Sequence, residues 1–121
     1  EAFGEIVCFS EESKFDAVTA ISGSGPAYIF LIAELMIEAG INMGLSRDES
    51  FKLVKHTIDG AGSLIVNSSL GPQKLRENVT SPGGTTHEAL VIMMNKENGL
   101  SKIFSSAIEA AAKRSKELGK V

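Results

Sequence analysis

A tight turn that leads into a helix carries the strongest chemical signal in this chain, at the run Ser-Pro-Gly-Gly-Thr-Thr-His-Glu of residues 81–88. Pro82 fixes one backbone angle, and Gly83 and Gly84 allow a left-handed backbone and the close approach of a ligand. Thr85, followed three residues later by Glu88, fits a capping box. This pattern predicts that a helix begins here.

The backbone amides at this helix start are suited to bind an anion. Those of Gly84, Thr85 and Thr86 would have no acceptor within the helix and would point outward. A helix start surrounded by glycine and hydroxyl residues suits a carboxylate or a phosphate. A plain helix cap with a tight turn before it explains the same residues, so the pattern alone leaves both interpretations open.

The spacing of apolar and helix-ending residues predicts an all-α fold of about five helices. Ser24 or Pro26 should begin the first helix, and Gly44 should follow its end. Ser46 and Glu49 form a capping box for the second helix. The expected helices are residues 24–43, 47–67, 73–78, 86–96 and 101–118.

The first of these helices is apolar around most of its circumference. Its polar residues Glu34, Glu38 and Asn42 lie four apart and form one narrow stripe. A helix of this kind must be buried on most sides, either at the centre of its own chain or against a second copy. We favour the second copy, and therefore an intertwined homodimer. Gly60 and Gly62 in the next helix favour close helix–helix contact, with a kink as the alternative.

Composition and charge argue against several classes of protein. The 121 residues suffice for one domain, and the net charge of −3 comes without a basic patch, which argues against nucleic-acid binding. The single Cys8 excludes an internal disulfide and fits a reducing cytoplasm. The histidines and the cysteine lack metal-ligand spacing, so we expect no metal. Glu34 and Glu38 interrupt the apolar run around residues 29–32 too early for a membrane span.

Three blocks of the sequence resemble the pyrroline-5-carboxylate reductase family, which catalyses the last step of proline biosynthesis. Two of them are residues 16–28 (DAVTAISGSGPAY) and residues 110–119 (AAAKRSKELG). In the third block the matching residues are Pro72, Leu75, Val79, Thr80, Ser81, Gly83, Gly84, Thr86, Ala89, Leu90 and Met93. Together they cover nearly the whole chain in the family's order. Two positions depart from the pattern: Met94, where an acidic or amide residue is expected, and His87, where a smaller or aliphatic residue is expected.

The resemblance implies an oxidoreductase that uses NADPH or NADH to reduce the C=N bond of 1-pyrroline-5-carboxylate, giving L-proline. Family members bind the dinucleotide on an N-terminal Rossmann domain, at a G-x-G-x-x-G turn. Here Gly23 and Gly25 are followed by Pro26 without the third glycine, and the chain begins at Glu1. We therefore expect a C-terminal portion that is inactive alone. Residues 1–15, with a short strand at 5–9, would be a remnant of the missing domain, and residues 16–121 the helical dimerisation and substrate-binding domain.

The resemblance also implies roles for individual residues in the loop. The substrate-binding residues would be Asn78, Ser81, Gly83, Gly84, Thr85 and Thr86. The Ser81 hydroxyl and the first helix amides would hold the substrate carboxylate, and Asn78 would order the loop. The Thr86 hydroxyl would bond the ring nitrogen and is the expected catalytic group.

A second set of residues would lie near the nicotinamide end of the cofactor. These are Ser22, Gly23, Ser24 and Gly25, where glycine lets a ligand approach the backbone. A helix-start turn explains the same four residues equally well.

Other enzyme classes fit the residues less well. A serine hydrolase elbow needs G-x-S-x-G, but Ser22 occupies the place of its first glycine. Hydroxyacid dehydrogenases of the phosphogluconate type place Lys and Asn where this chain has Ile29 and Ala33. Two functions remain: a portion of a reductase, or a stand-alone helical oligomerisation module without activity. The choice between NADH and NADPH, and assembly of dimers into a larger ring, stay open.

Overall fold

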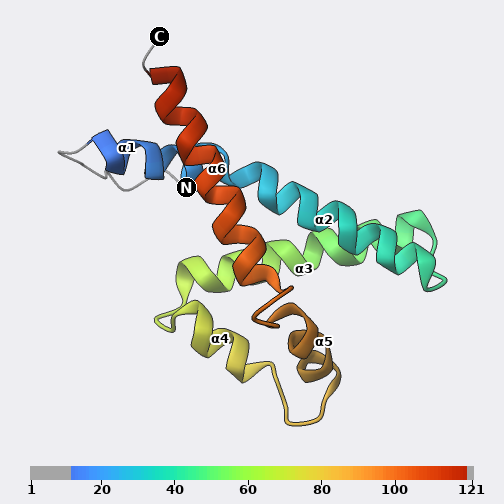
Figure 1. Cartoon of the computed structure of the whole chain (residues 1–121). Coiled ribbons are helices and arrows are strands. Elements are labelled where there is room, and N and C mark those ends of the chain that lie inside the picture. Colours follow the sequence, from blue (N-terminus) through green and yellow to red (C-terminus); the bar gives the residue numbers. More distant parts are fainter. Residues whose placement is uncertain (1–11, 120–121) are drawn as a thin grey trace.

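Helices make up nearly all of residues 12–119, which are the residues described by the computed structural model. The elements are α1 (Glu12–Val18), a π-helical turn η1 (Thr19–Gly23), α2 (Gly25–Asn42), α3 (Arg47–Asn67), α4 (Pro72–Asn78), α5 (Thr85–Met93) and α6 (Leu100–Gly119) (Figure 1). The all-α prediction is confirmed. The strand predicted at residues 5–9 lies outside the described residues.

The long helices begin and end close to their predicted limits. The capping box of α3 is complete, because the Ser46 hydroxyl accepts from the Glu49 amide at 3.1 Å and the Glu49 carboxylate accepts from the Ser46 amide at 2.8 Å. Gly44 follows α2 with a φ of 108°, a left-handed conformation that suits glycine. The capping residues therefore predicted the start of α3 and the end of α2 correctly.

The helical region before α2 was not predicted. Helix α1 and the turn η1 lead directly into α2, so Ser24 has helical backbone angles and its side chain makes no capping hydrogen bond. The predicted start of α2 near Ser24 or Pro26 is confirmed, with Ser24 at the N-cap position, but the chain is already helical when it reaches Ser24. Helix α1 begins four residues before Asp16, the residue at which the helical domain was predicted to begin.

Helix α5 is shorter than predicted and ends at Met93 rather than near residue 96. The Asn95 side chain accepts hydrogen bonds from the amides of Glu97 and Asn98 at 2.9 and 3.0 Å. The buried Gly99 then donates to the Asn95 carbonyl at 2.8 Å. An asparagine turn thus replaces the last turn of the predicted helix.

Helices α2 and α3 form a hairpin held by one close contact (Figure 1). The Ser50 hydroxyl, which is almost fully buried, donates to the Ile37 carbonyl at 2.8 Å. A Cβ at Gly40 would overlap that hydroxyl and lie 3.3 Å from the Leu45 side chain. An exposed ion pair between Glu38 and Arg47, at 2.9 Å, spans the same end of the hairpin.

Helix α6 packs across α1 and η1, the first two described elements (Figure 1). The Ser115 hydroxyl donates to the Asp16 carboxylate at 2.8 Å. Lower on α6, Phe104 meets Tyr28 of α2 edge to face, with ring centroids 6.3 Å apart. The two ends of the described chain are therefore joined by both a polar and an aromatic contact.

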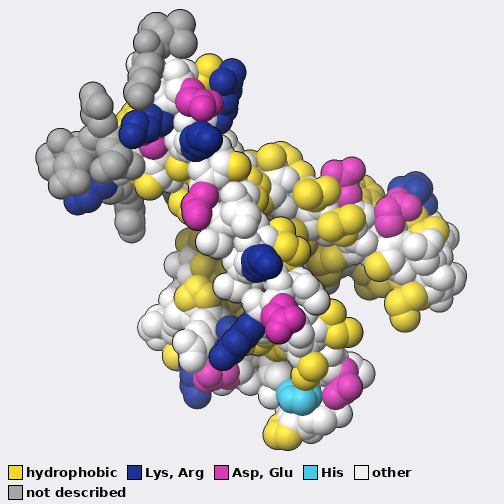
Figure 2. All heavy atoms as spheres, in the orientation of Figure 1, with side chains coloured by type: hydrophobic (Ala, Val, Ile, Leu, Met, Phe, Trp, Pro, Cys, Tyr) yellow, Lys and Arg dark blue, Asp and Glu magenta, His cyan; other side chains and the backbone are white. Residues whose placement is uncertain are grey.

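Much of the apolar surface of this chain is uncovered. Only Ala20 and Val54 are buried hydrophobic residues among those described, while on α2 the side chains of Phe30, Leu31 and Leu35 are 67%, 54% and 61% exposed. The accessible surface is 9771 Å², roughly one and a half times the value expected for a compact monomer of this mass. Figure 2 shows hydrophobic side chains spread along the α2–α3 hairpin. The structure therefore agrees with the prediction that α2 needs further burial, because its own chain leaves these side chains exposed.

The helical stretch Lys14–Asn42 is long and apolar enough, by length and composition, to cross a membrane, with a mean hydropathy of 1.5. Glu34 and Glu38 were predicted to interrupt the apolar run around residues 29–32 too early for a membrane span, but that run is only part of a longer helical stretch. Helix α1 and η1 extend the apolar stretch upstream of those two carboxylates. A core helix gives the same signal, and the uncovered side chains of α2 are also what an association surface requires.

Gly40→Ala should lower the stability of the hairpin. The added methyl group gains helix propensity but overlaps the Ser50 hydroxyl, and overpacking of this kind costs about 1–3 kcal/mol. The midpoint of thermal unfolding, followed by circular dichroism, should fall. Ser50→Ala in the same background removes the overlapping oxygen and should restore part of the loss. Equal stability of Gly40→Ala and the wild type would show that the two helices are not in close contact.

Candidate functional site

The loop between α4 and α5 lies at one tip of the molecule (Figure 1). Thr80 lies just after the end of α4, and its hydroxyl donates to the Arg76 carbonyl in the last turn of that helix at 2.6 Å. The next residues form a tight turn in which the Gly84 amide donates to the Ser81 carbonyl at 3.0 Å. Gly83 has a φ of 70°, in the left-handed region where other residues are strained. The predicted need for glycine at this turn is confirmed for Gly83.

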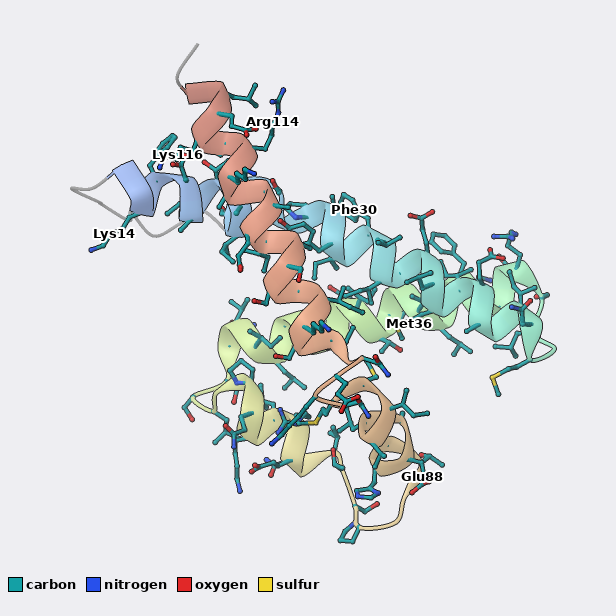
Figure 3. All side chains as sticks on the ribbon, in the orientation of Figure 1. Lys14, Phe30, Met36, Glu88, Arg114 and Lys116 are labelled. Atoms are coloured by element: carbon teal, nitrogen blue, oxygen red, sulfur yellow. The ribbon has the colours of Figure 1, made fainter. Side chains whose placement is uncertain are left out.

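Helix α5 begins at Thr85 with Gly84 as its cap, and no side chain caps it. The first helical bond runs from the Glu88 amide to the Gly84 carbonyl at 3.1 Å. The predicted capping box of Thr85 and Glu88 is wrong, because Thr85 already occupies the first helical position. The Glu88 carboxylate lies 3.5 Å from the His87 Nδ1 and on the side of α5 away from α4 (Figure 3).

The outward amides at this helix start belong to Thr85, Thr86 and His87. Within residues 12–119 none of these three donates to a backbone carbonyl, whereas the predicted third member, Gly84, donates to Ser81. A ligand that uses the Gly84 amide must share or replace that bond. Three free amides and the positive end of the helix dipole favour a small anion at this place.

The side chains around the turn are close together on its outer surface. Ser81 is exposed and Thr86 is half-buried, and the Ser81 Oγ lies 2.6 Å from the place that a Cβ on Gly84 would occupy. The absence of a side chain at Gly84 therefore makes room for the Ser81 hydroxyl. Asn78, predicted to order the loop, makes no side-chain hydrogen bond in the described part of the chain; Thr80 makes such a bond.

A shallow groove of about 410 Å³ runs between α4 and α5 behind the loop. Arg76 and Thr80 line one side of it, and His87, Leu90 and Met94 line the other. His87 and Met94 are the two positions that depart from the expected family pattern. Both departures thus fall in the same groove and outside the turn itself.

The residues predicted to lie near the cofactor form the junction of α1 and α2. Ser22 and Gly23 belong to η1 and are exposed, Ser24 follows it, and Gly25 begins α2. This junction lies where α6 crosses η1, far from the loop of residues 79–84 (Figure 1). One copy of the chain therefore does not bring the two predicted groups of site residues together.

Sequence reasoning gave no role to Tyr28, although it belongs to a block that resembles the family. Its hydroxyl donates to the Ala20 carbonyl at 2.6 Å, across η1. Long side chains on a helix lean toward its N-terminus, so a tyrosine soon after a glycine-rich turn was the available signal. The spacing of apolar residues in the sequence did not indicate the π-helical turn η1 that Tyr28 contacts.

A helical chain with an uncovered apolar surface and a glycine-rich helix start defines a class: an association domain that also carries an exposed polar loop. The sequence model of the family described as pyrroline-5-carboxylate reductase dimerisation matches residues 12–118. The chain belongs to this family.

Individual relatives agree with this assignment. The chain is 46% identical to the pyrroline-5-carboxylate reductase of Corynebacterium melassecola over 90% of this chain and 40% of that protein. It is 43% identical to the enzyme of Pseudomonas aeruginosa over 97% of this chain and 42% of that protein. The chain therefore spans about two fifths of the length of these curated relatives.

Solved structures give the same result. The pyrroline carboxylate reductase of Plasmodium falciparum with NADP bound superposes with a TM-score of 0.83 and 39% identity, over 94% of this chain and 43% of that one. The pyrroline-5-carboxylate reductase of Coxiella burnetii gives a TM-score of 0.88 and 38% identity, over 97% and 43%. The folds therefore correspond over nearly the whole of this chain.

Gly84→Ala should disturb the turn and the start of α5. The new Cβ would lie 2.6 Å from the Ser81 Oγ and 3.2 Å from the Ser81 carbonyl oxygen, so the serine must move. Faster hydrogen exchange of the Glu88 amide, which donates to the carbonyl of residue 84 at 3.1 Å, is the expected result. Gly71→Ala is the control, because that cap has an extended backbone and no atom within 4 Å of its Cβ position. Identical exchange in both variants would show that Gly84 has room for a side chain.

Proposed function

We propose that this chain is the dimerisation and substrate-binding part of a pyrroline-5-carboxylate reductase, which reduces 1-pyrroline-5-carboxylate to L-proline with NADPH or NADH. The observation that carries the proposal is the helix start at Thr85, with its free amides and neighbouring hydroxyls, in a chain of this family. The NADP in the Plasmodium falciparum structure supports the cofactor class.

The proposed reaction asks little covalent chemistry of the protein. The cofactor supplies the hydride, so the chain has to bind the imino acid, orient its C=N carbon and prevent it from binding in other orientations. The substrate presents a carboxylate and a ring nitrogen. The free amides at the start of α5 and the Ser81 hydroxyl suit the carboxylate, because both donate hydrogen bonds and the helix dipole favours negative charge.

Thr86 is the proposed catalytic residue. It stands at the second position of α5, with its amide free and its side chain half-buried beside the turn. With the substrate carboxylate held by the amides, the Thr86 hydroxyl is close enough in sequence and space to hydrogen-bond the ring nitrogen. That bond would orient the imine and hold the proton on nitrogen while the hydride reaches carbon.

The dinucleotide phosphates would be bound outside these 121 residues. The sequence contains no G-x-G-x-x-G turn, and Gly23 and Gly25 stand at the junction of η1 and α2. We therefore propose that a Rossmann domain of the longer protein holds the cofactor and that residues 1–15 connect to it. Ser22, Gly23, Ser24 and Gly25 would lie near the nicotinamide end.

A homodimer explains how the two groups of site residues form one site. They lie far apart in one chain, and α2 leaves its apolar side chains uncovered. Apart from the neighbouring residues and backbone of α3 itself, no atom of the described chain lies within 4 Å of a Cβ placed at Gly60 or Gly62, which leaves α3 open to close approach by a helix of a second copy. We propose an intertwined dimer in the cytoplasm, and the alternative function is a helical oligomerisation module without activity.

Thr86→Val in the full-length protein should lower kcat/KM for pyrroline-5-carboxylate by one to two orders of magnitude. The shape is preserved and one hydroxyl is lost; a hydrogen bond to a charged group is worth about 1.5–3 kcal/mol. Steady-state oxidation of NADPH measures the effect. Thr57→Val is the control, because that hydroxyl bonds only the Leu53 carbonyl of its own helix, at 2.7 Å. Unchanged kinetics in Thr86→Val would remove Thr86 from the mechanism.

A protein that consists of these 121 residues alone should show no reductase turnover. It offers a substrate loop and no phosphate-binding turn for the dinucleotide. The test follows NADPH absorbance with pyrroline-5-carboxylate and compares this protein with a full-length family member under the same conditions. Substrate-dependent oxidation of NADPH by the 121 residues would contradict the proposed division of labour.

The same 121 residues should form a stable dimer at low micromolar concentration. The interface should exceed about 2,000 Å² in total, as in obligate dimers, and unfolding should be coupled to dissociation. Sedimentation equilibrium measures the mass. Leu31→Asp and Leu35→Asp should give aggregated or unfolded protein, whereas Asn42→Asp, on the polar stripe of the same helix, should remain dimeric. A well-folded species of monomer mass would overturn the dimer.

A further inference from the structure

The turn η1 is an unusual element at an exposed position. A π-helical turn carries one residue more than an α-helical turn, is rare, and occurs often at functional sites. Here it spans Thr19–Gly23, and its last two residues, Ser22 and Gly23, are exposed. Such a turn needs support, because the α-helical alternative has better backbone hydrogen bonds.

The Tyr28 hydroxyl supplies that support. In an α-helix the Ser24 amide would donate to the Ala20 carbonyl, but here it donates to the Thr19 carbonyl at 2.9 Å. The Tyr28 hydroxyl donates to the Ala20 carbonyl instead, at 2.6 Å. Ala20 is fully buried and Tyr28 is half-buried, so this hydrogen bond is partly shielded from water, which strengthens it.

The Tyr28 ring is itself held in place. Phe104 of α6 meets it edge to face, at 6.3 Å between centroids and an interplanar angle of 79°. Helix α6 also packs directly on η1. Helix α6 therefore contacts both the ring that presents the hydroxyl and the turn that accepts its hydrogen bond.

The extra residue determines where the following backbone points. Each residue rotates a helix by about 100°, so relaxation of η1 to an α-helical turn would rotate α1 relative to α2 by about that angle. Ser22 and Gly23, at the end of the turn, would move with this change. The segment has room for a ligand, since a Cβ at Gly23 would have only the Thr19 side chain near it, at 3.7 Å.

We propose that Tyr28 is a positioning residue, whose hydroxyl holds η1 in the π-helical register and thereby presents the backbone of residues 22–25 to the nicotinamide end of the dinucleotide. This inference rests on the proposed function, which places the cofactor at that junction. Tyr28 acts through the turn and does not itself touch the cofactor. A purely structural hydrogen bond would affect stability and leave dinucleotide affinity unchanged.

Tyr28→Phe in the full-length protein tests this, because it removes the hydroxyl and keeps the ring against Phe104. Loss of a hydrogen bond of this kind should speed amide hydrogen exchange in the peptide of residues 19–27 by about twofold to tenfold. The dissociation constant of NADPH, measured by its fluorescence, should rise by up to the same factor. The KM for pyrroline-5-carboxylate should stay unchanged, since residues 22–25 are proposed to contact the cofactor and not the substrate.

Thr57→Val is the matched control, because it removes one hydroxyl that bonds a backbone carbonyl on α3; it should alter neither quantity. Unchanged exchange in Tyr28→Phe would overturn the inference, and so would faster exchange with unaltered NADPH affinity. A wild-type protein that neither binds NADPH nor reduces pyrroline-5-carboxylate would indicate failure of the proposed function itself. An active wild type with an unaffected Tyr28→Phe variant would reject the positioning role alone.

Discussion

The structure depends on one constraint, which is the apolar surface that this chain does not bury by itself. Its accessible surface is 9771 Å², where a compact monomer of the same mass would expose about 6,300 Å². The helices spread apart instead of closing around one core, and Val54 is one of only two buried hydrophobic residues among those described. An open arrangement of this kind becomes stable when a second surface covers it.

Two close contacts make the open chain rigid enough to present that surface. At one end of the α2–α3 hairpin, Ser50 fills the space that Gly40 leaves and donates to Ile37. At the other end of α2, Tyr28 bonds across η1 while Phe104 of α6 packs against its ring. Helix α2 is therefore fixed at both ends by side-chain contacts, although its middle has little covering from its own chain.

The sequence allowed accurate prediction where capping chemistry is local. The Ser46 and Glu49 capping box and Gly44 located the ends of α3 and α2, since each depends on residues within one turn. The capping of α5 and the turn η1 were not predicted correctly. Gly84 caps α5 without a side chain, and η1 depends on Tyr28 and on α6, which lies far away in the sequence. The site roles of Ser81 and Thr86 rest on family resemblance and stay predictions.

The geometry of one chain limits how a reductase site can be built from it. The free amides of Thr85 and Thr86 lie at one tip, and the exposed residues Ser22 and Gly23 lie far from them, where α6 crosses η1 (Figure 1). A site that includes both groups must take them from different copies. Burial of α2 and completion of the proposed site would then be the same event, so association would supply both stability and function. This link would explain why a domain with a proposed substrate loop also leaves so much of its apolar surface uncovered.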